Sequence, residues 1–370
     1  MWEAVIHGIR ITQAPCTPRS WSALLSLVRK IGKSFLLFPL LLSATAAAEK
    51  SAPIIDDPAY THAARLVEVE PARRLNLYCL GKGSPTVVFD SGITDETDVW
   101  ALVQPVIASH TRACSYDRAG SGYSDPGRRA GTSANIVDDL HRLLVAASIK
   151  PPYILVGHSY GGMNVRLYAD LYPAEVVGMV LVDSTSEDWV QSAWKLDMLQ
   201  RTYEQYHAQL EPFWQELREC VKAASAGFTE GTDLYKQCVP APDPRFSDAI
   251  NAAYLKAHMS LGYQQANLTE NINIHDASAD QVRAARRWYG DMPLTALTAS
   301  PNMKLWSNET QAHKDAVNRM IAGMHDQMAA LSKRGVVRPV PDSEHNIQMT
   351  KPDAVNDAIL EVLKEAAQKK

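Results

Sequence analysis

The segment that most constrains the fold is a glycine-flanked serine, Gly157-His158-Ser159-Tyr160-Gly161. A short apolar run, residues 153–156, precedes it, and a helical pattern, residues 163–169, follows it. Because Gly157 and Gly161 carry no Cβ, a strand and a helix can approach each other closely here. A strand–turn–helix of this kind strains the serine backbone and projects its hydroxyl from the carboxyl edge of a sheet. The segment therefore predicts a nucleophilic serine at position 159.

Apolar strand patterns alternate with amphipathic helical patterns along much of the chain. Residues 86–89 and 180–182 have the composition of buried strands. Residues 100–107 and 136–144 have helical spacing, and Ser133 is placed to cap the second of these helices. This alternation predicts an α/β fold with a mostly parallel, doubly wound sheet covered on both faces.

The alternation stops after Asp183, and residues 186–290 are mostly helical in character with no convincing strand pattern. We interpret this stretch as an inserted helical lid, whose aromatic side chains either pack its helices together or line an apolar pocket. Strand patterns resume at 293–298 and 335–340, and Thr350 to Asp353 has capping-box spacing before a terminal helix. The expected organisation is a first core part at 49–185, the lid at 186–290 and a second core part at 291–370.

Several motifs occur in an order that one known superfamily shares. Beside the glycine-flanked serine, they are Thr86 to Gly92, Asp117-Arg118-Ala119-Gly120-Ser121-Gly122-Tyr123-Ser124, and Ser343-Glu344-His345. In these motifs the chain resembles the α/β-hydrolase superfamily, from about residue 58 to the C-terminus. The resemblance implies an eight-stranded type of sheet, a catalytic triad, and catalysis with no metal or organic cofactor.

A serine hydroxyl becomes a useful nucleophile when a base takes its proton and a third group orients that base. The chain has eleven histidines, and the resemblance assigns the base to His345, on the loop after the last strand. The usual assignment of the triad acid does not apply here, because residues 299–303, where many relatives carry it, contain no carboxylate. We expect Asp183, at the end of the sixth strand, to be the acid, with Glu309 as the alternative. His313 and His325 are expected on helix surfaces.

The oxyanion hole is expected to use the backbone amides of Tyr160 and Ile93. The loop before Ile93 reads Ser91-Gly92, where relatives often have His-Gly, and backbone donors tolerate that change. His158 is interpreted as structural or pocket-lining, and Trp189 as a candidate pocket residue. The resemblance gives Asp117 and Arg118 a structural role outside the active site.

The N-terminal residues 1–48 have the pattern of an export signal. Arg29, Lys30 and Lys33 precede an apolar run at 35–42, and Ala46-Ala47-Ala48 offers a small-residue cleavage site. The alternative is a membrane-anchoring helix, although the apolar run is short for a span. We therefore expect an exported protein, periplasmic or secreted, with no stable membrane span once the signal is removed.

Net charge excludes one class of partner. Without residues 1–48 the chain has 32 Lys and Arg against 40 Asp and Glu, with no basic stripe. An acidic surface argues against nucleic acid as a partner. No phosphate-binding loop or zinc-type spacing is present in the sequence.

Four cysteines remain after the signal, as an exported protein would use for disulfides. Cys79 and Cys114 lie on strands that the resemblance makes neighbours, which implies a bridge between them. Cys220 and Cys238 are 18 positions apart in the expected lid, and a bridge there could stabilise it by roughly 3 kcal/mol. Buried free thiols are the alternative for all four.

Together these features predict an exported serine hydrolase that cleaves a carboxylic ester, lactone or thioester through an acyl-enzyme. Two alternatives stay open because fold does not determine reaction: a cofactor-free perhydrolase or lyase, and a non-catalytic ligand-binding relative. The partner is expected to be a small-molecule ester, and the sequence leaves its identity and the oligomeric state open.

Overall fold

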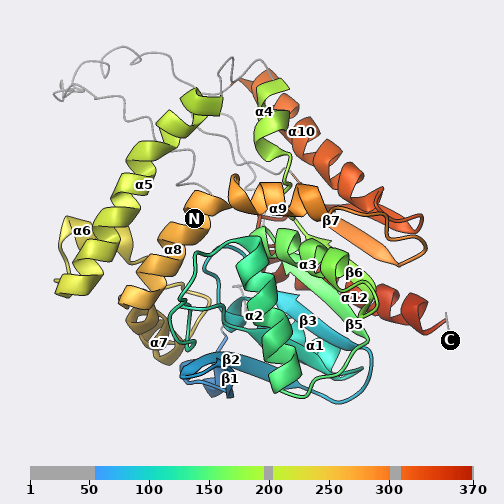
Figure 1. The fold of residues 1–370 in the computed structure, drawn as a ribbon, viewed down its shortest axis with the longest axis horizontal. Coiled ribbons are helices and arrows are strands. Elements are labelled where there is room, and N and C mark those ends of the chain that lie inside the picture. Colours follow the sequence, from blue (N-terminus) through green and yellow to red (C-terminus); the bar gives the residue numbers. More distant parts are fainter. Residues whose placement is uncertain (1–54, 196–202, 301–309, 369–370) are drawn as a thin grey trace, which may run out of the picture. The chain divides into compact units, whose positions relative to one another are not determined.

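A single eight-stranded sheet organises the chain in the computed structural model, which describes residues 55–195, 203–300 and 310–368. The strand order is β1-β2-β4-β3-β5-β6-β7-β8; β2 is antiparallel to β1 and β4, and all other neighbours are parallel. The strands are β1 Leu66–Glu70, β2 Arg73–Leu80, β3 Thr86–Asp90, β4 Ala113–Tyr116, β5 Tyr153–His158, β6 Val176–Val182, β7 Leu294–Ser300 and β8 Gly335–Pro341. The predicted α/β fold with a mostly parallel sheet is confirmed (Figure 1).

Helices cover both faces of the sheet. Successive strand residues point to opposite faces, so they are buried in two different apolar clusters. In β3, Val88 belongs to one apolar cluster, while Val87 and Phe89 belong to the other. The first cluster includes side chains of α2 (Ser133–Ala146), α3 (Tyr160–Leu171) and α10 (Gln311–Ala329). The second includes those of α1 (Gln104–Ala108) and α12 (Pro352–Ala367). Between these layers, the carboxyl ends of the parallel strands meet at one edge of the sheet.

Three local expectations need correction. Residues 100–107 do not form one helix, because the 3-10 turn Thr97–Trp100 ends before α1 begins. The cap of α2 is Thr132 rather than Ser133: Thr132 is extended, and its hydroxyl accepts from the Asn135 amide at 3.4 Å.

The expected capping box before α12 is also absent. Thr350 ends the short helix α11 (Ile347–Thr350), and its hydroxyl donates to the Asn346 carbonyl at 3.2 Å. Lys351 is the residue before α12 and makes no side-chain cap. Because Lys351 precedes a proline, its backbone is pushed away from the helical region, which separates the two helices.

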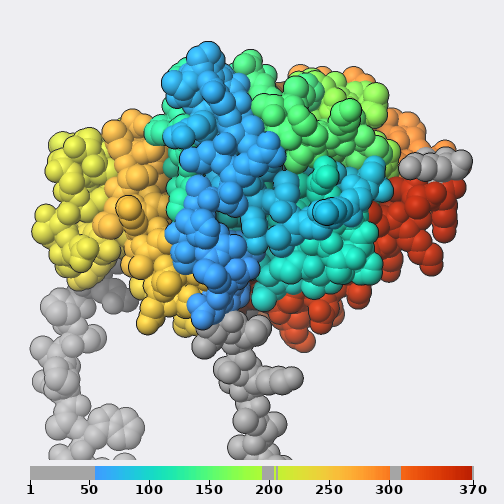
Figure 2. Space-filling view, turned by 90° about the horizontal axis from the view of Figure 1, so that it is seen from below, coloured from blue at the N-terminus to red at the C-terminus, as the bar shows by residue number. Residues whose placement is uncertain are grey.

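Between β6 and β7 lies a stretch that we call the helical insertion (residues 183–293), and its described residues form helices but no named strand. These helices are α4 Trp189–Lys195, α5 Tyr203–Ala226, α6 Asp233–Cys238, α7 Asp248–His258, α8 Leu261–Asn273 and α9 Ala277–Ala285. In the space-filling view, its yellow and orange residues lie beside the blue N-terminal strands (Figure 2). Helix α9 packs on α2 and α3, so the insertion is anchored on the sheet domain. Its role as a lid, and the expected domain limits, stay predictions.

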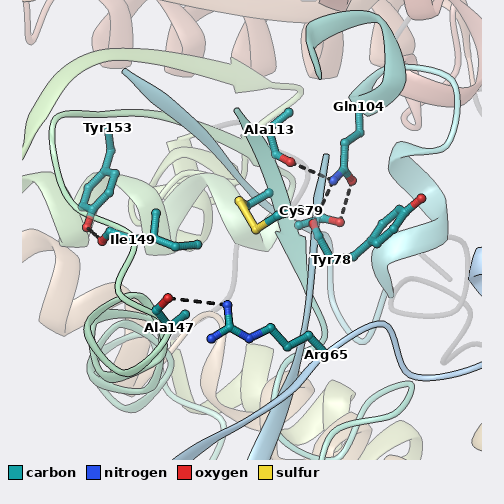
Figure 3. The surroundings of a disulfide bond; sticks show 10 residues. Arg65, Tyr78, Cys79, Gln104, Ala113, Ala147, Ile149 and Tyr153 are labelled. Carbon is teal, nitrogen blue, oxygen red and sulfur yellow. Dashed lines mark hydrogen bonds between the residues drawn. A yellow bond between two sulfur atoms is a disulfide. The ribbon is translucent and has the colours of Figure 1, made fainter. Parts of the chain in front are cut away.

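The described part of the chain contains two disulfides, and both expected pairings are confirmed. Cys79 and Cys114 face each other on the antiparallel strands β2 and β4. Next to this bridge the Gln104 amide donates to the carbonyls of Tyr78 at 2.8 Å and Ala113 at 3.1 Å (Figure 3). The second bridge, Cys220–Cys238, joins α5 to α6 within the helical insertion.

The predicted signal, residues 1–48, lies outside the described residues. Among the helices that the structure does describe, none combines the length and the apolar character that a membrane span requires.

Candidate active site

Ser159 occupies the turn between β5 and α3. Its backbone has φ +52°, the strained conformation that the glycine-flanked motif predicts. A Cβ on Gly161 would lie 2.2 Å from the Asp90 carbonyl oxygen, and one on Gly157 would lie 2.5 Å from the Gly161 carbonyl oxygen. These distances are too short for any side chain, so the two glycines allow the turn to pack against the end of β3.

The turn after β6 is tied to Ser159 through the backbone. The Ser159 amide donates to the Val182 carbonyl at 3.1 Å, and the Thr185 amide donates to the Ser159 carbonyl at 3.0 Å. Asp183 lies between these two contacts and also has a positive φ, +41°. The expected nucleophile and the expected acid are therefore held by one backbone network, at the carboxyl edge of two neighbouring strands.

Asp183 contacts the expected base directly. Its Oδ2 lies 2.6 Å from Nδ1 of His345, and its Oδ1 accepts from the Ala299 amide at 3.0 Å. Burial raises the pKa of Asp183, but the bond to His345 and nearby imidazoles outweigh it, so the pKa is below its usual value. A carboxylate can only accept, which places the proton on Nδ1 and leaves Nε2 as the basic nitrogen.

His158 is buried and supports the loop that carries His345. Its Nε2 donates to the His345 carbonyl at 3.1 Å, and the centroids of the two rings are 4.7 Å apart. Burial lowers the pKa of His158, which favours the neutral ring. Of the two interpretations open for His158, these contacts favour the structural one.

The two expected oxyanion donors lie on the loop after β3 and at the start of α3. Tyr160 is the first residue of α3, and its hydroxyl contacts the Gly131 carbonyl at 2.9 Å and the Ser278 hydroxyl at 2.7 Å. Because that side chain is buried away from the turn, Tyr160 can act there through its amide. A Cβ on Gly92 would lie 2.6 Å from an Asp95 carboxyl oxygen, so a side chain before Ile93 would require the Asp95 side chain to move.

His325 was expected on a helix surface, and that expectation is wrong. It is 2% exposed on α10, with Nδ1 2.7 Å from the Thr298 hydroxyl and Nε2 3.0 Å from the Ser184 carbonyl. Since a carbonyl only accepts, Nε2 carries the proton, and Thr298 donates to Nδ1. His325 therefore buttresses the strained turn that follows Asp183.

A sequence signal for His325 did exist. The buried residues of α10 recur at helical spacing, and position 325 lies on the same face; they are Val317, Ile321, Met324 and Met328.

Asp117 and Arg118 are both buried, and they contact neighbouring loops and the helical insertion. Asp117 accepts from the amides of Thr97 at 2.9 Å and Tyr123 at 3.1 Å. Arg118 contacts the loop after β3 and pairs with Glu270 of the helical insertion at 2.9 Å. Sequence reasoning did not single out Glu270.

Two further expectations stay untested. Trp189 begins α4, and its ring stacks on the His275 ring with centroids 6.2 Å apart. These contacts do not decide whether Trp189 also lines a pocket. Glu309, the alternative acid, lies outside the described residues. Across the described ranges, no group of three or more His, Cys, Asp or Glu side chains is arranged to hold a metal ion.

Comparison with known proteins identifies the family of the fold. A family model described as the alpha/beta hydrolase fold matches residues 85–352, well over half of the chain. The uncharacterized protein YqjL of Bacillus subtilis is 31% identical over 145 residues, which cover 38% of this chain and 57% of the relative. The chain spans between 16% and 57% of the curated relatives it matches.

Solved structures give the same fold at low sequence identity. A thermophilic esterase from Thermogutta terrifontis has a TM-score of 0.53 at 17% identity, covering 82% of this chain and 98% of that one. An alpha/beta hydrolase fold protein from Burkholderia ambifaria has a TM-score of 0.53 at 19% identity, covering 81% and 98% respectively.

Proposed function

The chain belongs to the α/β-hydrolase fold family, and on that premise we propose that it is an exported serine hydrolase of carboxylic esters. Lactones and thioesters present the same electrophilic carbonyl and are included in the proposal. The observation that carries it is the 2.6 Å contact between Nδ1 of His345 and the buried Asp183 carboxylate, beside the strained turn of Ser159.

The proposed reaction uses groups of the chain alone. His345 Nε2 takes the proton from Ser159 as its oxygen attacks the ester carbonyl carbon, while Asp183 stabilises the imidazolium. The amides of Tyr160 and Ile93 donate to the oxyanion. The alcohol leaves with the proton from His345, and water then releases the acid from the acyl-enzyme by the reverse steps.

The contacts around Asp183 support its part in this scheme. One carboxylate oxygen is held by the Ala299 amide and the other by His345, so the group is fixed at both ends. A pKa below the usual range keeps it charged at neutral pH, where it favours the imidazolium formed during attack. The similarity to a thermophilic esterase agrees with an ester substrate.

Export is part of the proposal and rests on separate features. The two disulfides suit an oxidising compartment, because thiols in reducing compartments are rarely paired. The predicted signal at residues 1–48 agrees with them.

A fluorophosphonate probe tests the proposal directly, because it forms a covalent bond with an activated serine. We expect labelling of the wild-type protein and none of Ser159→Ala. Ser192→Ala is a matched control, since Ser192 lies on α4 rather than in the turn after β5. Wild-type labelling in Ser159→Ala would reject the proposed nucleophile.

A panel of p-nitrophenyl esters with different acyl lengths then identifies the substrate class. Hydrolysis that is lost in Ser159→Ala supports the ester hydrolase. If esters are not cleaved but acetate and hydrogen peroxide give peracid, the perhydrolase alternative is supported instead.

A further inference from the structure

Arg118 and Glu270 form a buried ion pair that contacts the loop carrying the proposed oxyanion donor Ile93. Within the oxyanion loop (residues 91–94), Arg118 donates to the Ser91 carbonyl at 2.8 Å and to the Gly92 carbonyl. The Glu270 carboxylate accepts from the Thr94 amide at 2.9 Å. The backbone before Ile93 is therefore bound by the Arg118 cation, and the backbone after Ile93 is bound by the Glu270 anion.

The two charged groups also hold each other. Arg118 and Glu270 make two parallel contacts of 2.9 Å each, and they are 3% and 2% exposed. Arg118 makes a further 2.9 Å contact with Asp90, at the end of β3. Two-pronged pairing of this kind restricts both side chains in direction as well as in distance.

Because peptide groups are planar, these contacts also determine the orientation of the Ile93 amide. In a trans peptide the C=O and the next N–H point in opposite directions. Fixing the Gly92 carbonyl on Arg118 therefore fixes the opposite direction for the Ile93 N–H. Fixing the Thr94 N–H on Glu270 does the same for the peptide that follows Ile93. Both peptide planes next to Ile93 are set by one ion pair.

We propose that Arg118 and Glu270 are positioning residues that aim the Ile93 amide at the oxyanion of the transition state. Glu270 comes from α8 of the helical insertion, so the pair links the insertion to the catalytic edge of the sheet. This inference rests on the proposed function, because it assigns a task to the oxyanion hole of that same site. Through this pair, the insertion contributes to turnover.

The test compares Glu270→Ala and Glu270→Gln with the wild-type protein in hydrolysis of a p-nitrophenyl ester. We expect Glu270→Ala to lower kcat by roughly 100-fold, the loss seen when one oxyanion donor is removed, with little change in KM. In Glu270→Gln the amide oxygen can still accept from Thr94, so the loss should be smaller. Affinity for a trifluoromethyl ketone, whose serine adduct carries an oxyanion, should fall in parallel with kcat.

A matched control separates positioning from loss of a buried charge. Asp139→Asn removes a buried carboxylate that makes a similar two-pronged pair with Arg73 at 2.6 and 2.9 Å, and Asp139 lies on α2. We expect kcat and inhibitor affinity close to wild type in this variant. An equal loss of kcat in Asp139→Asn at equal thermal stability would overturn the inference.

The remaining outcomes distinguish failure of this inference from failure of the proposed function. If Glu270→Ala does not fold, Glu270→Gln carries the test, and wild-type kcat with wild-type inhibitor affinity in the folded variants would reject positioning. If Ser159→Ala retains turnover, the proposed function fails regardless of Glu270. If Ser159→Ala is inactive and the Glu270 variants are unaffected, only the present inference fails.

Discussion

His345 and Asp183 are 162 positions apart in sequence, yet Nδ1 of one lies 2.6 Å from Oδ2 of the other. In the proposed triad, this contact orients the imidazole so that Nε2 takes the role of the base. Asp183→Asn would keep the size of the side chain, but its amide could favour the wrong tautomer of His345 by donating to Nδ1. We expect kcat for ester hydrolysis to fall by about 10³–10⁴-fold, with the fold intact by circular dichroism.

Two variants accompany this measurement. Asp342→Asn changes an exposed carboxylate on the loop before His345 and should leave kcat near wild type. Glu309→Gln tests the alternative acid. Near-normal turnover in Asp183→Asn together with a large loss in Glu309→Gln would transfer the role to Glu309.

The strand–turn–helix around Ser159 could be predicted from the sequence because its signals are local. A strand pattern, a glycine-flanked serine and a helix pattern follow each other within about twenty residues, and the strained φ of Ser159 agrees with them. The resemblance to the α/β-hydrolase superfamily, drawn from these motifs and from those near Asp117 and His345, is confirmed by the family match.

Residues that act across the fold were harder to predict. His325 lies on the apolar face of α10, where the helical spacing of the buried residues predicts burial but not its contacts with Thr298 and Ser184. Glu270 belongs to a helix rich in Asn and Gln, where a carboxylate is ordinary. Its burial follows from Arg118, 152 positions away, and sequence periodicity does not contain that information.

Two glycines should respond oppositely to the same substitution. In Gly161→Ala the new Cβ would meet backbone oxygens at 2.2 and 2.5 Å, which cannot move without displacing β3. We expect a strong loss of soluble protein or of fluorophosphonate labelling. Gly323 lies inside α10 with open space around it, so Gly323→Ala should raise stability by about 0.5–1 kcal/mol. Soluble yield and probe labelling measure the first effect, and chemical denaturation measures the second. A destabilised Gly323→Ala would show that position 323 cannot accept a methyl group.

The disulfides predict how the purified exported protein responds to thiol reagents. Alkylation without reductant should add no mass at Cys79, Cys114, Cys220 or Cys238, because all four are paired. The double change Cys220→Ser and Cys238→Ser opens an 18-residue loop and should lower the free energy of unfolding by roughly 3 kcal/mol. Mass spectrometry and urea unfolding are the measurements. Free thiols at two positions of the untreated protein would contradict the pairing.

A buried histidine predicts the direction of one pH dependence. His258 is 1% exposed, between the rings of Tyr254 and Tyr263, and burial lowers its pKa to about 3. In the unfolded chain its pKa is about 6.5, so between these values the unfolded state binds more protons than the folded state. Stability contributed by neutral His258 is therefore present above pH 6.5 and is lost as the pH falls below it.

The change His258→Phe isolates this contribution, because it keeps an aromatic ring between the tyrosines and removes the titration. Nε2 of His258 lies 3.3 Å from Glu96, whose own pKa burial raises well above its usual value, so Glu96 opposes the trend in both proteins. Between pH 7 and pH 5 the free energy of unfolding should fall by about 2 kcal/mol more in the wild type than in His258→Phe. His110→Gln, at an exposed position, should keep the wild-type difference. Equal pH dependence in wild type and His258→Phe, measured by urea unfolding, would mean that His258 is not held neutral by the fold.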